Sequence, residues 1–524
     1  MFAGGTRAGL TSTSTESSQR LHSVMKLSSL FSASNRTGRF VRMLTTSNFN
    51  VAASAVYSIG LVPIVLHFSN VSELGLWTLI VQFSGYLSVI DAGVTSACIR
   101  RFVGPIARKE MTDLSAVFKT AFLVSLSQGA LCCLVGLLAY PIGLLLGIGT
   151  GKLILFSSVL FTQFFLVGIF FLVRPFTSLL LAAQRFEINN AVSSFATALS
   201  LGLIWLGFRM GFGLWTLPLV SLFQQAISSS VTFVMVRKLD LLPHFWWRQS
   251  SNWKGISDLF QEALDFFSWS GFSVAGSSLQ SIFLSRFLGL EAVAIWNVGS
   301  KLGSFAYMLL SNLFNTAFMG LAELKERGDP QRCCASFLNL FISSISLLSF
   351  FAGFAILLNP LFISIWTHNQ VTLPPSCTGV IFCWLILASI LRGLACFSNV
   401  WQTRKVMRMG PALEFVSLLL FLILSLVNPS LLFFSLALLA SQIPPFLLAY
   451  APLFLAACKS VNVQLSRNQC NVVMASAVCF GSSIIIHILS IQLSVALVIL
   501  LIASLPWFYF FSKSARALIG LHRS

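Results

Sequence analysis

Four basic residues of this sequence fall inside its long apolar runs: Lys119, Arg174, Lys301 and Arg392. A cation at the centre of a bilayer costs about 2.5–3.5 kcal/mol on insertion scales, so a side chain kept there usually faces a cavity or a specific partner. The planar guanidinium of arginine donates paired hydrogen bonds to a carboxylate or a phosphate. These residues therefore predict the binding of an anion inside a membrane.

Three of the four cations are predicted at similar depths. Arg174 and Arg392 each precede the end of an apolar run by ten residues, and Lys301 follows Glu291, at the start of its run, by ten. At about 1.5 Å per helical residue, each lies about 15 Å from the membrane surface, with no acidic partner evident at that depth. We expect Arg174, Arg392 and Lys301 to line a central water-filled cavity that binds the anion. The alternative is that each bonds to buried polar groups and only stabilises the fold.

Asp91 lies near the end of another apolar run, in the segment VIDAGVTSACIRR (89–101). An acid within a membrane is a candidate carrier of a proton or another coupling ion. The alternatives are an ion pair with Arg100 or Arg101, or stabilisation of a helix break at Gly93. All three interpretations remain open at the level of the sequence.

Three further charged residues are weaker candidates for the same site. Lys119 is close to the start of its run, so its long side chain can reach the membrane surface. Arg286 lies in a short connection between two runs. Glu414 follows Pro411 and is predicted in the first turn of a helix, where a carboxylate interacts favourably with the helix dipole.

The sequence contains no motif typical of catalysis or of cofactor binding. The segment GIGTGKL (147–153) lacks the GxxxxGK[ST] spacing of a nucleotide-binding loop. The eleven cysteines lie mostly inside apolar runs, without metal-ligand spacing. We therefore predict a protein that is not an enzyme and that binds no metal and no cofactor. The remaining enzymatic alternative, a membrane glycosyltransferase, would need a pair of external acids that the sequence lacks.

The composition indicates which elements position these residues. Of the 524 residues, 56% are hydrophobic and 9% are charged, against roughly 25% charged in soluble domains. Continuous runs such as LILFSSVLFTQFFLVGIFFLV (153–173) are long enough to cross about 30 Å of hydrocarbon as helices, and they lack the alternation of barrel strands. We predict an all-α polytopic membrane protein with about 14 transmembrane helices. The predicted spans are 46–68, 74–98, 115–139, 155–183, 188–208, 213–236, 262–285, 291–323, 334–358, 378–401, 412–427, 430–457, 470–488 and 493–512.

Lysine and arginine are unevenly distributed between alternate connections. One set of segments, which includes both termini, holds 26 of them, whereas the other set holds only Lys152, Arg209 and Arg286. Because basic connections remain in the cytoplasm, we predict a multi-pass protein of the cell (inner) membrane with both termini cytoplasmic. Contacts with lipid headgroups also explain the net charge of +18 and argue against a nucleic-acid partner.

The chain resembles itself at an offset of about 218 residues. RPFTSLLLAAQR (174–185) parallels RGLACFSNVWQTR (392–404), and LVPIVLHFSNVSELGLWTL (61–79) parallels SIFLSRFLGLEAVAIWNVG (281–299). Repeats of this kind place a substrate path between two halves. The predicted organisation is a disordered basic Ser/Thr-rich cytoplasmic tail (1–45), a six-helix half (46–236), a cytoplasmic linker (237–261), a second six-helix half (262–457), and two additional helices with a short cytoplasmic tail (458–524).

Two stretches resemble the bacterial polysaccharide, or O-antigen, flippases of the multidrug/oligosaccharidyl-lipid/polysaccharide exporter superfamily. They are ELGLWTLIVQFSGYLSVIDAGVTSACIRRFVGPIARKE (73–110) and IFLSRFLGLEAVAIWNVGSKL (282–302). The resemblance implies a transporter that flips polyprenyl-diphosphate-linked oligosaccharide, the polysaccharide repeat unit, to the outer leaflet by alternating access. It also implies that Arg174, Arg392 and Lys301 hold the diphosphate, and that an ion gradient drives transport, with Asp91 as the coupling candidate.

The same resemblance implies the partners and leaves alternatives open. The partners are the lipid-linked oligosaccharide, membrane lipids and the polysaccharide polymerase machinery. A cell-wall lipid-precursor flippase would share the cationic cavity, whereas a cation-coupled multidrug exporter of the same superfamily would favour acids there. No motif identifies the glycan, the coupling ion or the oligomeric state.

Overall fold

The structure, a computed structural model, describes residues 36–521 apart from 92, 109, 184, 243–245, 249–270, 273, 327, 402–403, 464–465 and 490–492. Every regular element among these residues is a helix, which confirms the predicted all-α fold. This is the expected solution, because a helix satisfies its own backbone hydrogen bonds and lipid offers no partners for them. Residues 1–35 of the predicted tail and most of the predicted linker lie outside the described residues.

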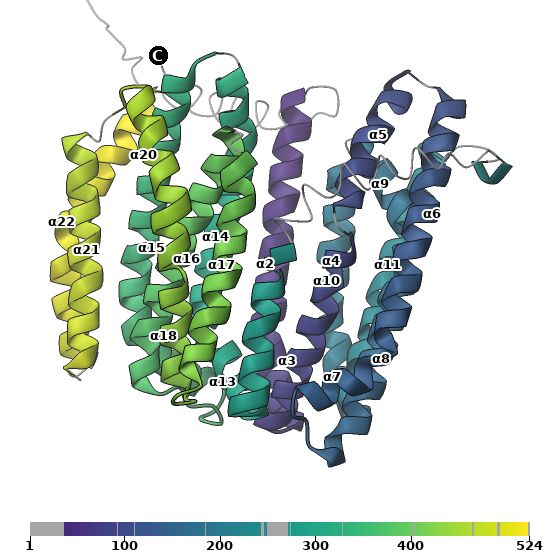
Figure 1. The fold of residues 1–524 in the computed structure, drawn as a ribbon, viewed down its shortest axis with the longest axis horizontal. Coiled ribbons are helices and arrows are strands. Elements are labelled where there is room, and N and C mark those ends of the chain that lie inside the picture. The colour runs from purple at the N-terminus through teal and green to yellow at the C-terminus, as the bar shows by residue number, and fades with distance from the viewer. Residues whose placement is uncertain are drawn as a thin grey trace, which may run out of the picture.

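The first group of helices spans residues 36–238 and is drawn in purple to blue-green in Figure 1. It starts earlier than predicted, since the last ten residues assigned to the disordered tail belong to a helix that begins at Arg36. The elements are α2 (Arg36–Phe68), α3 (Val71–Tyr86), α4 (Ser88–Asp91), α5 (Val94–Arg108), α6 (Met111–Gly136), α7 (Ala139–Leu145), α8 (Thr150–Phe171), α9 (Arg174–Ala182), α10 (Phe186–Arg209), η1 (Gly213–Trp215) and α11 (Thr216–Lys238).

The second group follows the described part of the linker, which includes the turn η2 (Trp246–Arg248). It begins with helical residues 271–272 and 274–283 and the π-helical turn η3 (Leu284–Leu288). The remaining elements are α13 (Leu290–Gly299), α14 (Lys301–Glu326), α15 (Pro330–Trp366), α16 (Pro375–Trp401), α17 (Arg404–Ser425), α18 (Leu431–Ser441), α19 (Ile443–Pro445), η4 (Phe446–Tyr450), α20 (Ala451–Ser460), α21 (Arg467–Ile488) and α22 (Leu493–Leu521). The last two helices form the yellow edge of the molecule (Figure 1).

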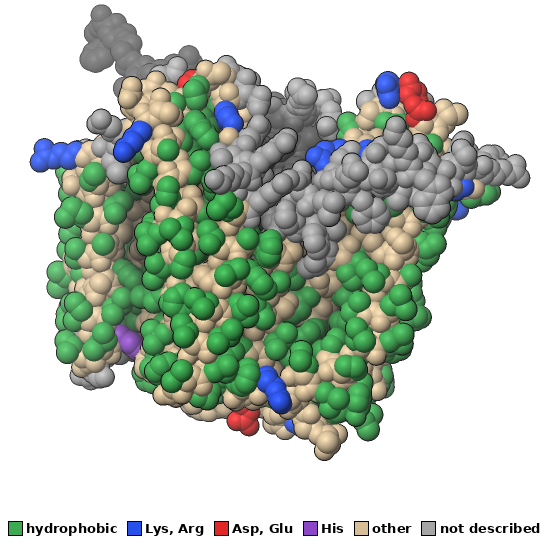
Figure 2. Space-filling view, viewed as in Figure 1, with side chains coloured by type: hydrophobic (Ala, Val, Ile, Leu, Met, Phe, Trp, Pro, Cys, Tyr) green, Lys and Arg blue, Asp and Glu red, His purple; other side chains and the backbone are tan. Residues whose placement is uncertain are grey.

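The surface of the helices is that of a membrane protein. Within the described residues, nine helices are long and apolar enough to cross a membrane by length and composition, and shorter apolar helices accompany them. Large hydrophobic side chains are exposed along these helices, including Ile154, Leu448 and Ile488. In the face shown in Figure 2, hydrophobic side chains cover the band between the two ends, where the described charged side chains gather. The chain is thus a multi-pass membrane protein, and the count of fourteen spans stays a prediction.

The two groups of helices contact each other at the end opposite to the Lys- and Arg-rich connections (Figure 1). Here α3 packs against α13, and a Cβ added to Gly75 would lie only 2.2 Å from the Leu290 carbonyl oxygen. The Ser285 hydroxyl donates a hydrogen bond of 2.8 Å to the Leu146 carbonyl oxygen. The two segments that the internal repeat aligns are therefore in direct contact, at what we call the contact end.

Candidate anion-binding site

Breaks in two helices position the first pair of charged side chains. α8 gives way to α9 at Arg174 because Pro175 lacks a backbone N–H and disfavours helical geometry in the residue before it. α4 ends at Asp91, and Gly93 has φ +78°, a left-handed conformation that glycine adopts without strain. Each break thus lies beside a charged residue.

Arg174 and Asp91 form an ion pair across these breaks. The distance from Arg174 Nη1 to Asp91 Oδ1 is 2.7 Å, with 32% and 21% of the two side chains exposed. Asp91 Oδ1 also accepts a 2.6 Å hydrogen bond from the Thr95 hydroxyl, and the Arg174 guanidinium carbon lies 3.7 Å from the centre of the Phe171 ring. The expectation that Arg174 lacks an acidic partner at its depth is therefore wrong, because the partner comes from a different helix.

Arg392 has its own acidic neighbour in the second group of helices. Glu414, on α17, interacts with the Arg392 guanidinium and with the Tyr450 hydroxyl. Glu414 was predicted in the first turn of its helix, but α17 begins at Arg404 and carries Pro411 in its interior. The acid therefore lies within the helix, at the depth of Arg392, rather than at a helix start.

Lys301 differs from the two arginines. It opens α14, directly after the turn at Ser300 that separates α13 from α14. Its side chain is half-buried, yet it forms neither an ion pair nor a side-chain hydrogen bond with any residue that the structure describes. Of the three predicted cations, Lys301 is thus the one whose charge the described residues leave uncompensated.

Glu414 lines a cavity of about 270 Å³ in the second group of helices. Ser304 lines it from the turn of α14 that follows Lys301, on the same face of the helix. Tyr307, which also lines the cavity, interacts with Arg392. The other polar lining residues include Ser277, Gln280, Glu414 and Gln442. The second group of helices therefore brings an acid and several hydrogen-bonding groups to one cavity. Lys301 precedes the lining residue Ser304 by one helical turn, and Arg392 interacts with the lining residues Tyr307 and Glu414.

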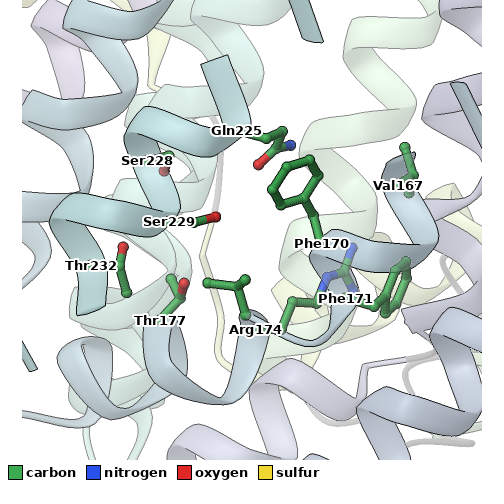
Figure 3. Close-up of a pocket in the computed structure, with 10 residues that line it drawn as sticks. Val167, Phe170, Phe171, Arg174, Thr177, Gln225, Ser228, Ser229 and Thr232 are labelled. Atoms are coloured by element: carbon green, nitrogen blue, oxygen red, sulfur yellow. The ribbon is translucent and has the colours of Figure 1, made fainter. Parts of the chain in front are cut away.

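A second, smaller cavity of about 120 Å³ lies beside Arg174, within the first group of helices (Figure 3). α8 and α9 contribute Phe170, Phe171 and Arg174, and α11 contributes polar side chains on the opposite side. These polar residues were not predicted from the sequence, although they recur along one face of α11. They are Gln225, Ser228, Ser229 and Thr232.

Of the three weaker candidates, Glu414 lines the cavity of about 270 Å³, whereas Lys119 and Arg286 line neither cavity. Lys119 Nζ donates a 3.2 Å hydrogen bond to the Trp247 carbonyl oxygen, at the Lys- and Arg-rich end. Arg286 is exposed at the contact end, where its side chain packs against Gly147. The described residues contain no cluster of three or more His, Cys, Asp or Glu side chains that could hold a metal ion.

Comparison with known proteins identifies the fold. No family model matches the sequence, and no curated protein matches it either. Among solved structures, the lipid II flippase MurJ in an inward closed conformation matches with a TM-score of 0.64 at 14% identity, over 91% of this chain and 100% of MurJ. The MATE transporter VcmN of Vibrio cholerae matches with a TM-score of 0.51 at 16% identity, over 82% of this chain and 98% of VcmN. The eukaryotic MATE transporter AtDTX14 gives 0.51 at 14% identity, over 81% and 100%.

These matches define a class of protein before they define a family. The chain has a membrane-transporter fold, and its structural neighbours are transporters rather than enzymes. More specifically, the chain shares the fold of the lipid II flippase MurJ and of the MATE transporters. The fold that the resemblance predicted is thereby confirmed.

Proposed function

We propose that this protein flips a polyprenyl-diphosphate-linked oligosaccharide, a polysaccharide repeat unit, across the inner membrane by alternating access. The observation that carries the proposal is Lys301, a half-buried cation within the membrane that no described residue neutralises. An uncompensated charge at that depth is costly and is expected to have a ligand of opposite charge. Two six-helix halves, two additional helices and cytoplasmic termini complete the proposed organisation.

The diphosphate binds at the larger cavity, between Lys301 and Arg392. A diphosphate presents several oxygen acceptors, which suit the ammonium of Lys301 and the fork of the Arg392 guanidinium. The hydroxyl and amide groups of Ser304, Tyr307 and Gln442 add uncharged donors. Arg174 contacts a neighbouring part of the same substrate from the first half.

A second candidate, the flipping of a cell-wall lipid precursor, is favoured by one specific observation. The matching structure with a TM-score of 0.64 is a lipid II flippase. Both candidates share a polyprenyl-diphosphate headgroup, so the same cations serve either substrate. A multidrug exporter fits less well, because a cationic drug would be repelled by Lys301. The proposed partners are accordingly the lipid-linked substrate, membrane lipids and the polymerases that consume the flipped unit.

Coupling to an ion gradient is assigned to one of the two acids that pair with the arginines, Glu414 before Asp91. When the substrate anion takes the place of a carboxylate on an arginine, that carboxylate is left uncompensated within the membrane. It is then expected to take up a proton or another cation, because a lone buried charge is strongly disfavoured. Asp91 and Glu414 both occupy this position, and Glu414 shares its cavity with the diphosphate.

The test is flipping of two probes in proteoliposomes, a polyprenyl-diphosphate-linked oligosaccharide repeat unit and lipid II. Lys301→Gln removes one charge-assisted hydrogen bond to phosphate, so we expect about a ten- to hundredfold loss of flipping rate. The matched control is Lys459→Gln, which removes an exposed lysine from the last turn of α20. The double variant Arg174→Gln/Arg392→Gln is expected to lose flipping as well.

Thermal unfolding of the same variants distinguishes a role in substrate binding from a role in stabilising the fold. Removing an uncompensated buried charge is neutral or stabilising, whereas removing a charge that braces the fold is destabilising. We therefore expect Lys301→Gln to keep or raise the melting temperature while flipping is lost. Unchanged flipping of both probes by Lys301→Gln, or failure of the original protein to flip either, contradicts the proposal.

A further inference from the structure

The smaller cavity has a row of polar side chains with no assigned role. The row lies on one face of α11, at intervals of three, one and three residues, and Thr177 faces it from α9. Its members are Gln225, Ser228, Ser229 and Thr232. Ser228 lies ten residues before the end of α11 at Lys238, which places it about 15 Å deep. A row of this kind is therefore near the middle of the membrane, not at its surface.

The hydroxyls of this row form no hydrogen bond with other residues that the structure describes. Helical Ser and Thr side chains in this chain commonly donate to a carbonyl oxygen three or four residues earlier, as Ser200 does to Thr197 at 2.7 Å and Thr120 to Ala116 at 3.0 Å. Within the described residues, Ser228, Ser229 and Thr232 make no such bond and no other hydrogen bond. Polar groups inside a membrane protein need partners, so these hydroxyls are available to a ligand or to water.

The charges of the residues that line the cavity indicate which kind of ligand it can bind. Arg174 is the cation at its edge, but the carboxylate of Asp91 lies 2.7 Å away, so the pair is neutral as a whole. The other polar lining groups are hydroxyls and an amide, which both donate and accept hydrogen bonds. Such a lining matches an uncharged group rich in hydroxyls better than it matches a second anion.

The volume of the cavity and the aromatic rings on one side of it further restrict which ligands can bind. A volume of about 120 Å³ is well below the roughly 300 Å³ at which drug-sized sites begin. The rings of Phe170 and Phe171 lie across from the hydroxyls of α11 (Figure 3). One edge of a sugar ring carries hydroxyls and its faces carry C–H groups, so a single sugar unit can meet both sides of this cavity.

We propose that the face of α11 formed by Gln225, Ser228, Ser229 and Thr232 is a subsite for one sugar unit of the transported lipid. The inference rests on the proposed function for the identity of the whole substrate. It adds that the two halves divide the recognition, the second half holding the diphosphate and the first half holding a sugar. The α11 residues then determine which glycans are carried.

The test removes only the hydroxyls. The variant Ser228→Ala/Ser229→Ala/Thr232→Val keeps the side-chain shapes, and the matched control Ser115→Ala/Ser200→Ala/Thr120→Val removes three hydroxyls of the same half that bond to their own helices. Flipping is measured for polyprenyl diphosphate with and without one N-acetylhexosamine. Binding of the soluble disaccharide N,N′-diacetylchitobiose is measured separately, by saturation-transfer NMR on the protein in nanodiscs.

We expect the α11 variant to lose about ten- to hundredfold in flipping of the glycosylated probe, as three missing hydrogen bonds predict, with the sugar-free probe unaffected. We also expect it to lose the disaccharide signal that the original and the control retain. Equal losses with both lipid probes would assign the face to phosphate and overturn the proposal, as would an unchanged disaccharide signal or none in the original protein. If the original flips neither lipid, the proposed function fails, and the disaccharide measurement still decides the subsite.

Discussion

The packing at the contact end predicts that a single added methyl group will separate the two groups of helices. In α3, a Cβ added to Gly75 would lie 2.2 Å from the Leu290 carbonyl oxygen and 2.9 Å from its carbon, both backbone atoms that cannot rotate away. Gly75→Ala therefore forces α3 and α13 apart, at a cost of about 1–3 kcal/mol for overpacking. The cost falls only on the state in which the two groups touch, so the equilibrium between closed and separated contact ends shifts by a factor of about 5 to 150.

The same helix supplies the control. Gly85 also belongs to α3, but a Cβ added there meets nothing within 4 Å. Both substitutions gain the helix propensity of alanine, up to about 1 kcal/mol, so the difference between them isolates the contact with α13. We expect Gly85→Ala to raise the melting temperature slightly and to leave the conformation unchanged.

The assay is a distance measurement across the contact end. Spin labels are attached to cysteines introduced at Thr150 and Gln370, which are exposed in the first and second groups, in a background without the eleven native cysteines. Double electron–electron resonance is expected to give one short distance for the original and Gly85→Ala proteins, and an added longer distance for Gly75→Ala. A Gly75→Ala protein that is folded and keeps only the short distance would refute the reasoning, because the contact would then not hold the groups together.

Two further predictions concern charges and the interface. Glu414→Gln is expected to abolish the dependence of flipping on an imposed proton or sodium gradient. Asp91→Asn is expected to keep that dependence and to lower stability by about 1–3 kcal/mol, because it leaves Arg174 partly buried without its counter-ion. Initial flipping rates with and without each gradient, together with thermal unfolding, distinguish the roles of the two acids. Tyr86→Phe removes hydrogen bonds of 3.0 Å to the Ser277 carbonyl oxygen and 3.1 Å to the Ser281 hydroxyl. We expect the free energy of unfolding, measured with denaturant, to fall by about 1–2 kcal/mol. An unchanged free energy of unfolding would contradict the role of these hydrogen bonds at the interface.

Helix positions were predictable because hydrophobic length is a property of contiguous sequence. The predicted span 46–68 ends at the residue where α2 ends, and 378–401 ends with α16 at Trp401. Only a continuous apolar run can cross the hydrocarbon, so hydropathy fixes each segment. The start of α2 could not be found this way, because its first residues are polar and extend beyond the apolar run.

The partners of the charged residues could not be predicted, for a different physical reason. Asp91 and Arg174 meet only because two helices face each other with a particular rotation. Helices that are apolar all round carry little information on which side faces the protein interior. The sequence did contain one usable signal, since the glycine at 93 and the proline at 175 mark breaks that lie next to the two charges.

The charges found at the candidate site constrain how the proposed transport must work. Asp91 neutralises Arg174, and Glu414 interacts with Arg392. Lys301 is therefore the one of these three cations that no acid among the described residues neutralises. A diphosphate linkage carries more than one negative charge, and one ammonium does not balance it. The second positive charge must come from an arginine that exchanges its carboxylate for the substrate. Arg392 is the arginine that interacts with Tyr307, which lines the cavity one helical turn from Lys301. The displaced Glu414 must then bind a cation or a proton. On the proposed function, ion coupling therefore follows from the charge balance of the cavity and needs no separate ion-binding domain.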